Sequence, residues 1–187
     1  DLPARSLEQI PDNGPLVVVA NHPTGTADGL ALLYAISRVR RDVRVVANRM
    51  LSHLEPLSSL FIAVDNIGNR TRKTAIKEME AHLERGGALI FFPSGEVSRP
   101  GLDGIQDGVW NAGFVKLASR YRAPVLPVHI AGRNSLAFYG AALVAPPLAM
   151  LMLIREMFRK RGTTLPVNIG ERIPWSAWHD ANAHPRD

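Results

Sequence analysis

The chain has 187 residues, a formal net charge of +5 and no cysteine. This length suits one domain with a substantial core and leaves little room for a second folding unit. Without cysteine, disulfides, thiolate nucleophiles and cysteine metal sites are excluded, so that any nucleophile must be oxygen or nitrogen. The positive charge favours anionic partners, which include membrane surfaces, phosphorylated substrates and nucleic acid, without choosing among them.

We find neither a signal peptide nor a membrane-spanning pattern. No charged segment followed by an apolar segment occurs near the first residue. The longest uncharged apolar stretch, residues 141–154, is too short for a spanning helix and is interrupted by Pro146 and Pro147. We therefore expect no transmembrane segment in this sequence.

Short runs rich in Val, Ile, Leu and Phe predict strands that are buried on both faces. They cover residues 15–20, 43–47, 60–64, 88–92, 124–130 and 165–169. Apolar residues at helical spacing occur between them, over residues 72–85 with Thr71 as N-cap and Gly86 as the stop, and over residues 110–121. This alternation predicts a single α/β domain over residues 1–187, with a central, mostly parallel or mixed sheet flanked by helices.

The first predicted strand ends in NHPTGTADG, residues 21–29. His22 therefore lies at the carboxyl end of a strand, which is the edge where open α/β sheets bind ligands. Asp28 lies at the start of the next helical pattern, where its carboxylate can accept from one imidazole nitrogen while the other nitrogen takes a proton. For an isolated pair of this kind, a turn histidine and a helix-capping aspartate are the simpler interpretation.

This block resembles the first motif of the glycerophospholipid acyltransferase superfamily, in which Asn-His precedes a short loop that ends in Asp. The loop between His22 and Asp28 is one residue longer than is usual there. The resemblance covers residues 15–135 in four blocks that keep the order of the family. It is to a divergent branch related to haemolysin-type acyltransferases, and it implies a glycerolipid acyltransferase-like fold.

The second block is an apolar strand followed by a basic residue. Here the strand at residues 61–64 leads to Arg70. The resemblance implies that Arg70 binds the phosphate or carboxylate of the acceptor, because a guanidinium group suits such anions. A solvated loop arginine is the alternative.

The third block reads FPSGEVSR at residues 92–99, where the family has FPEGTRS starting at the same phenylalanine. Glu96 and Arg99 each lie two residues beyond the positions at which the family has its glutamate and arginine. We expect Glu96 and Arg99 to supply a carboxylate and a cation near the histidine through a rearranged loop. Ser94 and Gly95 complete this expected part of the substrate site.

The fourth block is the apolar run of residues 123–130, which is followed by AGRNS. The resemblance implies that this strand lines the site. Arg133 and Ser135 follow its carboxyl end, on the same sheet edge as His22, and are expected to bind the acceptor head group or the donor. His129, inside the apolar run, is expected to be a hydrogen-bonded core residue.

The resemblance implies direct transfer of a fatty acyl group from acyl-CoA or acyl carrier protein to a lysophospholipid or lyso-aminolipid. His22 is expected to act as general base and Asp28 to fix its tautomer, while backbone N–H groups of residues 94–96 stabilise the oxyanion. No metal, bound cofactor or covalent intermediate is needed.

The expected location is peripheral, at the inner, cytoplasmic face of the membrane. Residues 136–161 are the expected membrane-contacting helical segment, because their apolar stretch runs into four cations. A core helix with a polar last turn is the alternative.

Three other functions compete with acyl transfer. A serine lipid hydrolase or esterase would use Ser94 or Ser98 with the histidine, although no Gly-x-Ser-x-Gly elbow is present. A nucleotide-binding loop would extend from Gly68 to Thr74, but Arg72 occupies the position of its second glycine. A nucleic-acid-binding module has only the charge in its favour, since no motif or aromatic platform accompanies it.

Overall fold

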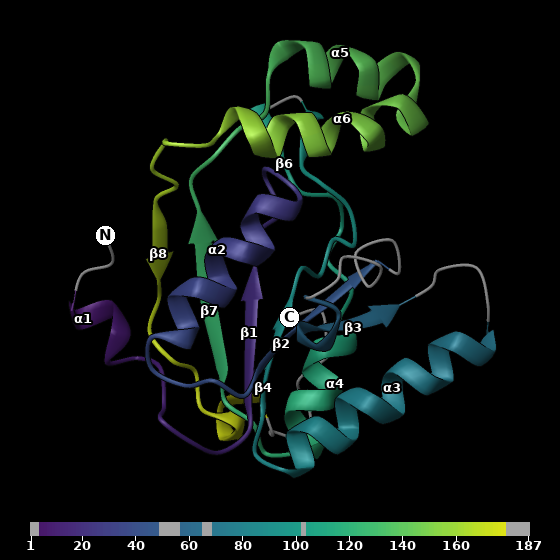
Figure 1. The fold of residues 1–187 in the computed structure, drawn as a ribbon. Coiled ribbons are helices and arrows are strands. Elements are labelled where there is room, and N and C mark those ends of the chain that lie inside the picture. The colour runs from purple at the N-terminus through teal and green to yellow at the C-terminus, as the bar shows by residue number, and fades with distance from the viewer. Residues whose placement is uncertain (1–3, 49–56, 65–68, 102–103, 179–187) are drawn as a thin grey trace.

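The computed structural model describes residues 4–48, 57–64, 69–101 and 104–178 (Figure 1). Within these residues, a six-stranded sheet has the order β3-β2-β4-β1-β7-β8. Its strands are β1 (Leu16–Ala20), β2 (Val43–Asn48), β3 (Phe61–Val64), β4 (Ala88–Phe91), β7 (Val125–Ile130) and β8 (Val167–Ile169). All neighbours are parallel except β8, which runs antiparallel to β7. The predicted α/β fold with a mixed, mostly parallel sheet is therefore confirmed.

Helices cover both faces of this sheet. The helical elements are α1 (Ala4–Leu7), α2 (Thr26–Ser37), α3 (Asn69–Glu84), α4 (Gly113–Arg120), α5 (Leu136–Val144) and α6 (Pro146–Arg159), with 3-10 turns at Ser58–Leu60 and Trp175–Trp178. Along β1, Leu16 and Val18 pack in the core under α2, whereas Val17 and Val19 pack in the core under α3 and α4. Every residue of β1 is buried. The strand therefore reads as an uninterrupted apolar run in the sequence.

Helix α3 begins earlier than its apolar pattern indicates. It starts at Asn69, so the predicted N-cap at Thr71 is wrong, because Thr71 lies within the first turn. The apolar spacing reaches its first buried residue only at Ala75, and the polar residues before it offer several possible starts. The predicted stop is confirmed, since Gly86 has φ +81 and its N–H donates to Leu83 O at 2.9 Å.

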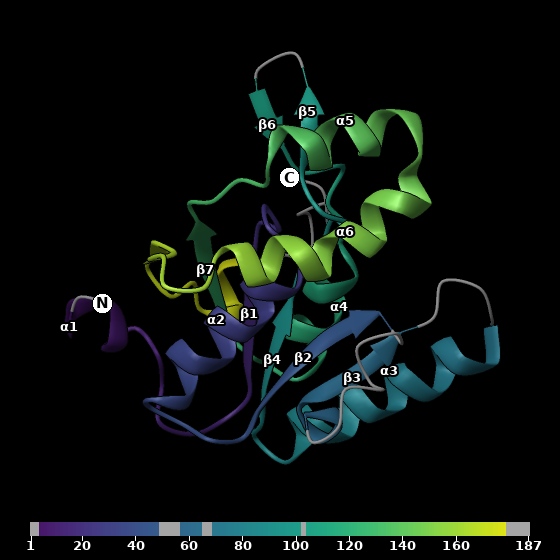
Figure 2. The same cartoon turned by 45° about the horizontal axis from the view of Figure 1, so that its top comes forward.

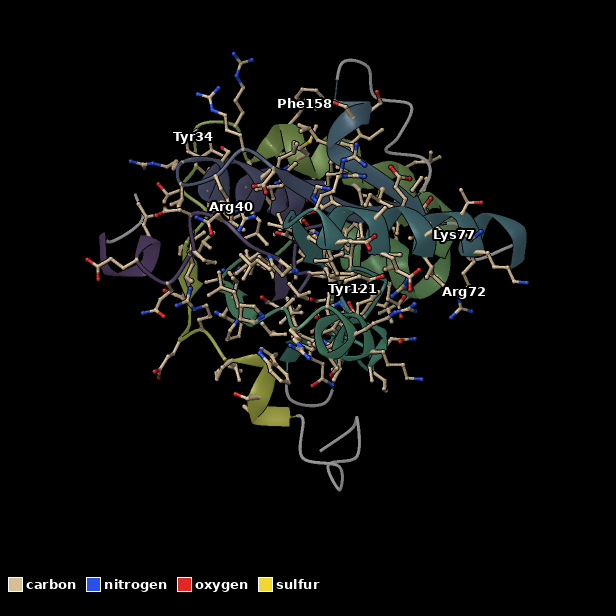
Figure 3. The ribbon with its side chains drawn as sticks, turned by 90° about the horizontal axis from the view of Figure 1, so that it is seen from below. Tyr34, Arg40, Arg72, Lys77, Tyr121 and Phe158 are labelled. Atoms are coloured by element: carbon tan, nitrogen blue, oxygen red, sulfur yellow. The ribbon has the colours of Figure 1, made fainter. Side chains whose placement is uncertain are left out.

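The amino edge of the sheet is held by a partly buried polar network. Figure 3 looks onto this edge and labels Arg40. The Arg40 guanidinium donates to both carboxylate oxygens of Asp42 at 2.7 Å and to Gly86 O at 2.6 Å, and this hydrogen bonding holds the pKa of Asp42 below its usual value. His82 Nε2–H donates to Asp42 O at 3.0 Å and to Ala88 O at 3.2 Å. Burial lowers the pKa of His82.

Helices α5 and α6 form a hairpin above the carboxyl edge of the sheet (Figures 1 and 2). The chain turns at Ala145, and α6 starts at Pro146, as is common for proline in a first helical turn. The two helices pack against each other, and α6 also contacts α2. Beside α5 lies the two-stranded hairpin of β5 (Arg99–Gly101) and β6 (Gly104–Gln106). No helix among the described residues is long and apolar enough to cross a bilayer.

Candidate active site

The connections that follow β1 and β4 diverge at the carboxyl edge of the sheet. These strands are neighbours, but β1 continues into α2 on one face of the sheet, and β4 leads on to α4 on the other face. Ligands of open α/β sheets bind where adjacent connections diverge in this way. The first motif follows β1 at this point, and the loop of residues 92–98 follows β4.

The Asp28 carboxylate meets both the first turn of α2 and the imidazole of His22. Asp28 is fully buried and is the third residue of α2. Its Oδ2 accepts the backbone N–H groups of Thr24 at 2.7 Å and Gly25 at 2.9 Å, and its Oδ1 accepts the Thr24 hydroxyl. The same Oδ2 lies 3.1 Å from His22 Nδ1. The helix cap and the histidine partner are therefore one group rather than alternatives.

The His22 ring contacts Phe92 on one face and Asp28 at its Nδ1 atom. The ring stacks on Phe92 with centroids 4.1 Å apart and an interplanar angle of 27°. Nδ1 is buried, and at 3.1 Å the Asp28 oxygen is out of line for a straight hydrogen bond. Nε2 has no hydrogen-bond partner in the described part of the chain and is not among its buried, unpaired atoms.

Gly25 accommodates the longer loop of the first motif. Its φ of +84 and ψ of −132 form a conformation that only glycine adopts readily. A Cβ at this position would lie 2.9 Å from Leu153 Cδ2 of α6. The extra residue is thus taken up by a turn pressed against α6, and Asp28 still reaches the histidine.

The backbone of His22 is fixed from the opposite side by Asp107. Asp107 Oδ1 accepts the His22 N–H at 3.1 Å and the Ser98 hydroxyl, while Oδ2 accepts the Trp110 indole N–H at 3.0 Å. The Ser98 N–H donates to His22 O at 2.9 Å. Both backbone groups of His22 are therefore occupied. Sequence reasoning missed Asp107, because the partners lie 85 residues apart and no local motif marks the contact.

The loop after β4 keeps its charged pair on the surface. Glu96 Oε2 lies 3.0 Å from Arg99 Nη2, and both side chains are about half exposed. Arg99 also donates to Ala142 O of α5 at 3.3 Å. The structure thus brings Glu96 and Arg99 to each other, and neither has a contact with His22 within the described ranges.

The same loop contains the predicted oxyanion donors. The Gly95 N–H closes a turn on Phe92 O at 2.9 Å, with Gly95 at φ +69. The backbone N–H groups of Ser94 and Glu96 make no backbone hydrogen bond to another described residue. The Ser94 hydroxyl donates to Glu96 O at 2.8 Å. Since the Ser98 hydroxyl is also used, by Asp107, neither serine is paired with His22 as a hydrolase nucleophile would be.

This geometry agrees with the comparison to known families. A family model described as Acyltransferase matches residues 2–183. The chain belongs to this acyltransferase family. Lyso-glycine lipid O-acyltransferases of Phocaeicola vulgatus and Bacteroides thetaiotaomicron are 35% and 34% identical to it over 181 residues. The matches cover 93% of this chain but 64% and 66% of those proteins, so it spans just under two thirds of their length.

A solved structure supports the fold. The crystal structure of the 1-acyl-sn-glycerophosphate acyltransferase PlsC from Thermotoga maritima matches with a TM-score of 0.57 at 19% identity. The match covers 93% of this acyltransferase-family chain and 61% of that one. Together with the family match, it confirms the predicted membership of the glycerophospholipid acyltransferase superfamily.

The end of β7 in this acyltransferase-family chain is tied to both the first motif and α6. The Asn21 side chain donates to Ile130 O at 3.0 Å and accepts the Ile130 N–H at 2.7 Å. Ser135 caps α5, and its backbone N–H and hydroxyl donate to Glu156 at 2.9 and 2.6 Å. Burial raises the pKa of Glu156, but these hydrogen bonds and nearby cations outweigh it and lower the pKa overall. Arg133 is exposed.

A cavity of about 410 Å³ opens beside the first motif. Asn21 and Pro23 line it, but the His22 ring does not. His129 also lines it and is exposed, so its predicted core position is wrong. The cause is its place on the α3 and α4 face of β7, at the end where the cavity replaces packed side chains. The cavity therefore lies behind the backbone of the motif rather than at the imidazole.

The remaining predicted site residues lie around the start of α3. Arg70 belongs to its first turn, and its side chain is outside the described part of the structure. Gly68 also lies outside the described residues. Residues 69–74 are helical, whereas a nucleotide-binding loop needs irregular backbone before the helix to surround phosphates.

Proposed function

We propose that this chain carries the active site of an O-acyltransferase that moves a fatty acyl group onto a lysolipid. The observation that supports it best is the His22 imidazole, paired with buried Asp28 at a topological switch point and open at Nε2. The names of the two relatives favour a lyso-glycine lipid, which is a lyso-aminolipid, as acceptor. A lysophospholipid is the other acceptor class. Acyl-CoA or acyl carrier protein is the co-substrate, with no bound cofactor.

In the proposed reaction, His22 Nε2 takes the proton of the acceptor hydroxyl as its oxygen attacks the thioester carbonyl. Asp28 holds Nδ1 protonated and stabilises the imidazolium that forms. Backbone N–H groups of Ser94 and Glu96, which make no other backbone bond, stabilise the oxyanion. When the tetrahedral intermediate formed by this attack collapses, the carbon–sulfur bond breaks, and the imidazolium returns its proton to the leaving thiolate. The products are the ester and the free thiol.

Two cations at the carboxyl edge of the sheet are candidates to bind the anionic groups of the substrates. Arg99 and Arg133 lie at this edge, and both are solvent accessible. Guanidinium groups suit carboxylate and phosphate, so we assign them to the acceptor head group or the donor phosphates. Ser94, Gly95 and Glu96 complete the loop between them, and Ser135 positions α5. The protein works as a peripheral enzyme at the inner face of the membrane.

The test is acyl transfer by the purified chain, measured by mass spectrometry of the lipid products. A panel of lysolipids, including a lyso-glycine lipid, is incubated with acyl-CoA and with acyl carrier protein donors. His22→Ala is expected to lower kcat about 10²–10⁴-fold, with an unchanged thermal transition. His129→Ala is the matched histidine control and should retain activity, because His129 is exposed and has no partner among the described residues.

Two outcomes contradict the proposal. Near-normal turnover by the His22→Ala variant excludes it as general base. Release of free fatty acid without an acceptor, with an initial burst, indicates an acyl-enzyme and therefore a serine hydrolase.

A further inference from the structure

The α5–α6 hairpin presents an apolar outer face to solvent. On α5, Leu136, Leu143 and Val144 are 88%, 73% and 88% exposed. On α6, Leu151, Ile154 and Phe158 are 64%, 59% and 65% exposed and recur at helical spacing. Figure 2 shows the two helices side by side, and Figure 3, seen from below, labels Phe158 near the end of α6. Contiguous exposed apolar surface of this kind marks an interaction site.

The hairpin is firmly built, so its outward face is a fixed feature. Phe138, Tyr139, Ala142 and Ala149 form a buried cluster on its inner side. Glu156 of α6 is 2% exposed and receives both hydrogen bonds from Ser135 at the start of α5. Only a well-positioned, paired carboxylate is tolerated at such a depth. The exposed apolar residues therefore do not result from loose packing.

The exposed charges of the hairpin itself are all positive. Arg155 and Arg159 lie in the last turns of α6, and Lys160 and Arg161 come directly after it. The only acidic residue in 136–161 is Glu156, which is buried. Arg159 lies 3.7 Å from Glu156, and Lys160 donates to Arg133 O at 2.6 Å. A second copy of the chain on this face would bring like charges together, and an apolar protein surface would leave Arg155 and Arg161 without partners. An anionic lipid surface offers acyl chains to the apolar face and phosphates to the cations.

We infer that the α5–α6 hairpin lies in the surface of an anionic bilayer, with its apolar face among the acyl chains and its cations at the level of the phosphates. The hairpin also contacts the proposed catalytic motif, because Leu153 of α6 packs against Gly25 in the loop between His22 and Asp28. Seating α5 and α6 on the bilayer thus brings the carboxyl edge of the sheet to the lipid surface. Only the link between this membrane surface and catalysis rests on the proposed function.

Co-sedimentation of the chain with vesicles tests the inference. Vesicles of phosphatidylcholine with and without phosphatidylglycerol serve as probes, at low and high salt. The Ile154→Gln/Phe158→Gln variant is expected to bind both vesicle types at least about tenfold more weakly. The Arg155→Gln/Arg161→Gln variant is expected to lose only the additional, salt-sensitive binding to anionic vesicles. Ile76→Gln, a partly exposed apolar residue of α3 on another surface, should bind as the parent chain does.

The outcomes separate the surface from the chemistry. Vesicle binding by Ile154→Gln/Phe158→Gln equal to that of the parent chain overturns the inference. So does a parent dimer that becomes monomeric in this variant with no change in vesicle binding, because the face is then an interface between copies. Turnover of a lysolipid dispersed below its micelle concentration is measured separately. If the parent chain binds vesicles but does not turn over the dispersed lysolipid, the proposed function is rejected while the membrane-binding surface is retained.

Discussion

Asp107 accepts the backbone N–H of His22 and thereby joins the loop after β4 to the first motif. This contact, at 3.1 Å, is reinforced by the Ser98 hydroxyl on the same oxygen and by the Ser98 N–H on His22 O. The carboxylate does not contact the imidazole. It holds the backbone of the residue that bears the imidazole, so we expect it to position the ring.

Removal of this carboxylate should slow turnover more than it weakens substrate binding. Asp107→Ala leaves the His22 N–H and the Ser98 hydroxyl without an acceptor, so we expect kcat to fall about 10–100-fold and stability to fall by about 1–3 kcal/mol, with KM little changed. Trp110→Phe removes one donor to Asp107 but keeps the His22 contact, and should cause a much smaller loss. Steady-state kinetics and thermal melts check both variants. Equal kcat losses for the two would show that the His22 contact is not what matters.

Asp28 both caps α2 and contacts His22, so two substitutions should separate its effect on stability from its effect on activity. Asp28→Asn keeps an oxygen for the Thr24 and Gly25 N–H groups but removes the charge beside His22, so activity should fall about 10²–10⁴-fold with most stability retained. Asp28→Ala loses the cap as well and should be less stable by about 0.5–2 kcal/mol. Chemical denaturation and acyl transfer assays measure the two effects. If the asparagine variant retains full activity, the carboxylate serves only as a cap.

Gly25 is expected to tolerate no side chain. Gly25→Ala meets both a backbone conformation that costs about 1–3 kcal/mol and Leu153 Cδ2 at 2.9 Å. Adding Leu153→Ala relieves the closest contact but leaves Val97 Cγ2 at 3.3 Å and the backbone strain, so the double variant should recover only part of the stability. Gly14→Ala, at φ +81 with open space around its Cβ position, reports the backbone cost alone. Complete recovery in the double variant would mean that the φ angle of Gly25 costs nothing.

The stability of the fold should decrease as the pH falls below the normal pKa of histidine. Burial lowers the pKa of His82 in the folded chain from its ordinary value of 6.5, so below 6.5 the unfolded chain binds a proton that the folded chain does not. Stability is complete above pH 6.5 and is lost as the pH falls towards the folded pKa. The free energy of unfolding, measured from pH 8 to pH 5, should show a shallower dependence in His82→Gln. Parallel curves for the two proteins would exclude His82 as the titrating group.

Much of the fold could be predicted because its central strands β1 and β4 are buried on both faces, although the edge strand β8 is only partly buried. Burial of this kind leaves continuous apolar runs, and each of the six predicted strands is present with its ends moved by at most a few residues. The start of α3 was missed because a polar first turn carries no apolar spacing. Position 129 was misassigned because an apolar strand passes, at its last residues, from packed core to the wall of the cavity.

The site was predictable only where it is local. His22 and Asp28 lie within one loop and one helix turn. Their spacing alone favours a simple cap, and the four blocks in family order make them a candidate pair. The hydrogen bonds of Asp107, and the pairing of Ser135 with Glu156 across 21 residues, depend on tertiary contacts that leave no periodic trace in the sequence.

The longer first loop also changes how such a motif is best defined. Asp28 keeps its contact because it is the third residue of α2 and its carboxylate points back over the helix start, while Gly25 takes up the surplus residue. The distance along the chain from the histidine is therefore free to vary, whereas the place of the aspartate on its helix is not. A search that counts from the helix start would recover chains with unequal loops that a fixed His-to-Asp spacing passes over.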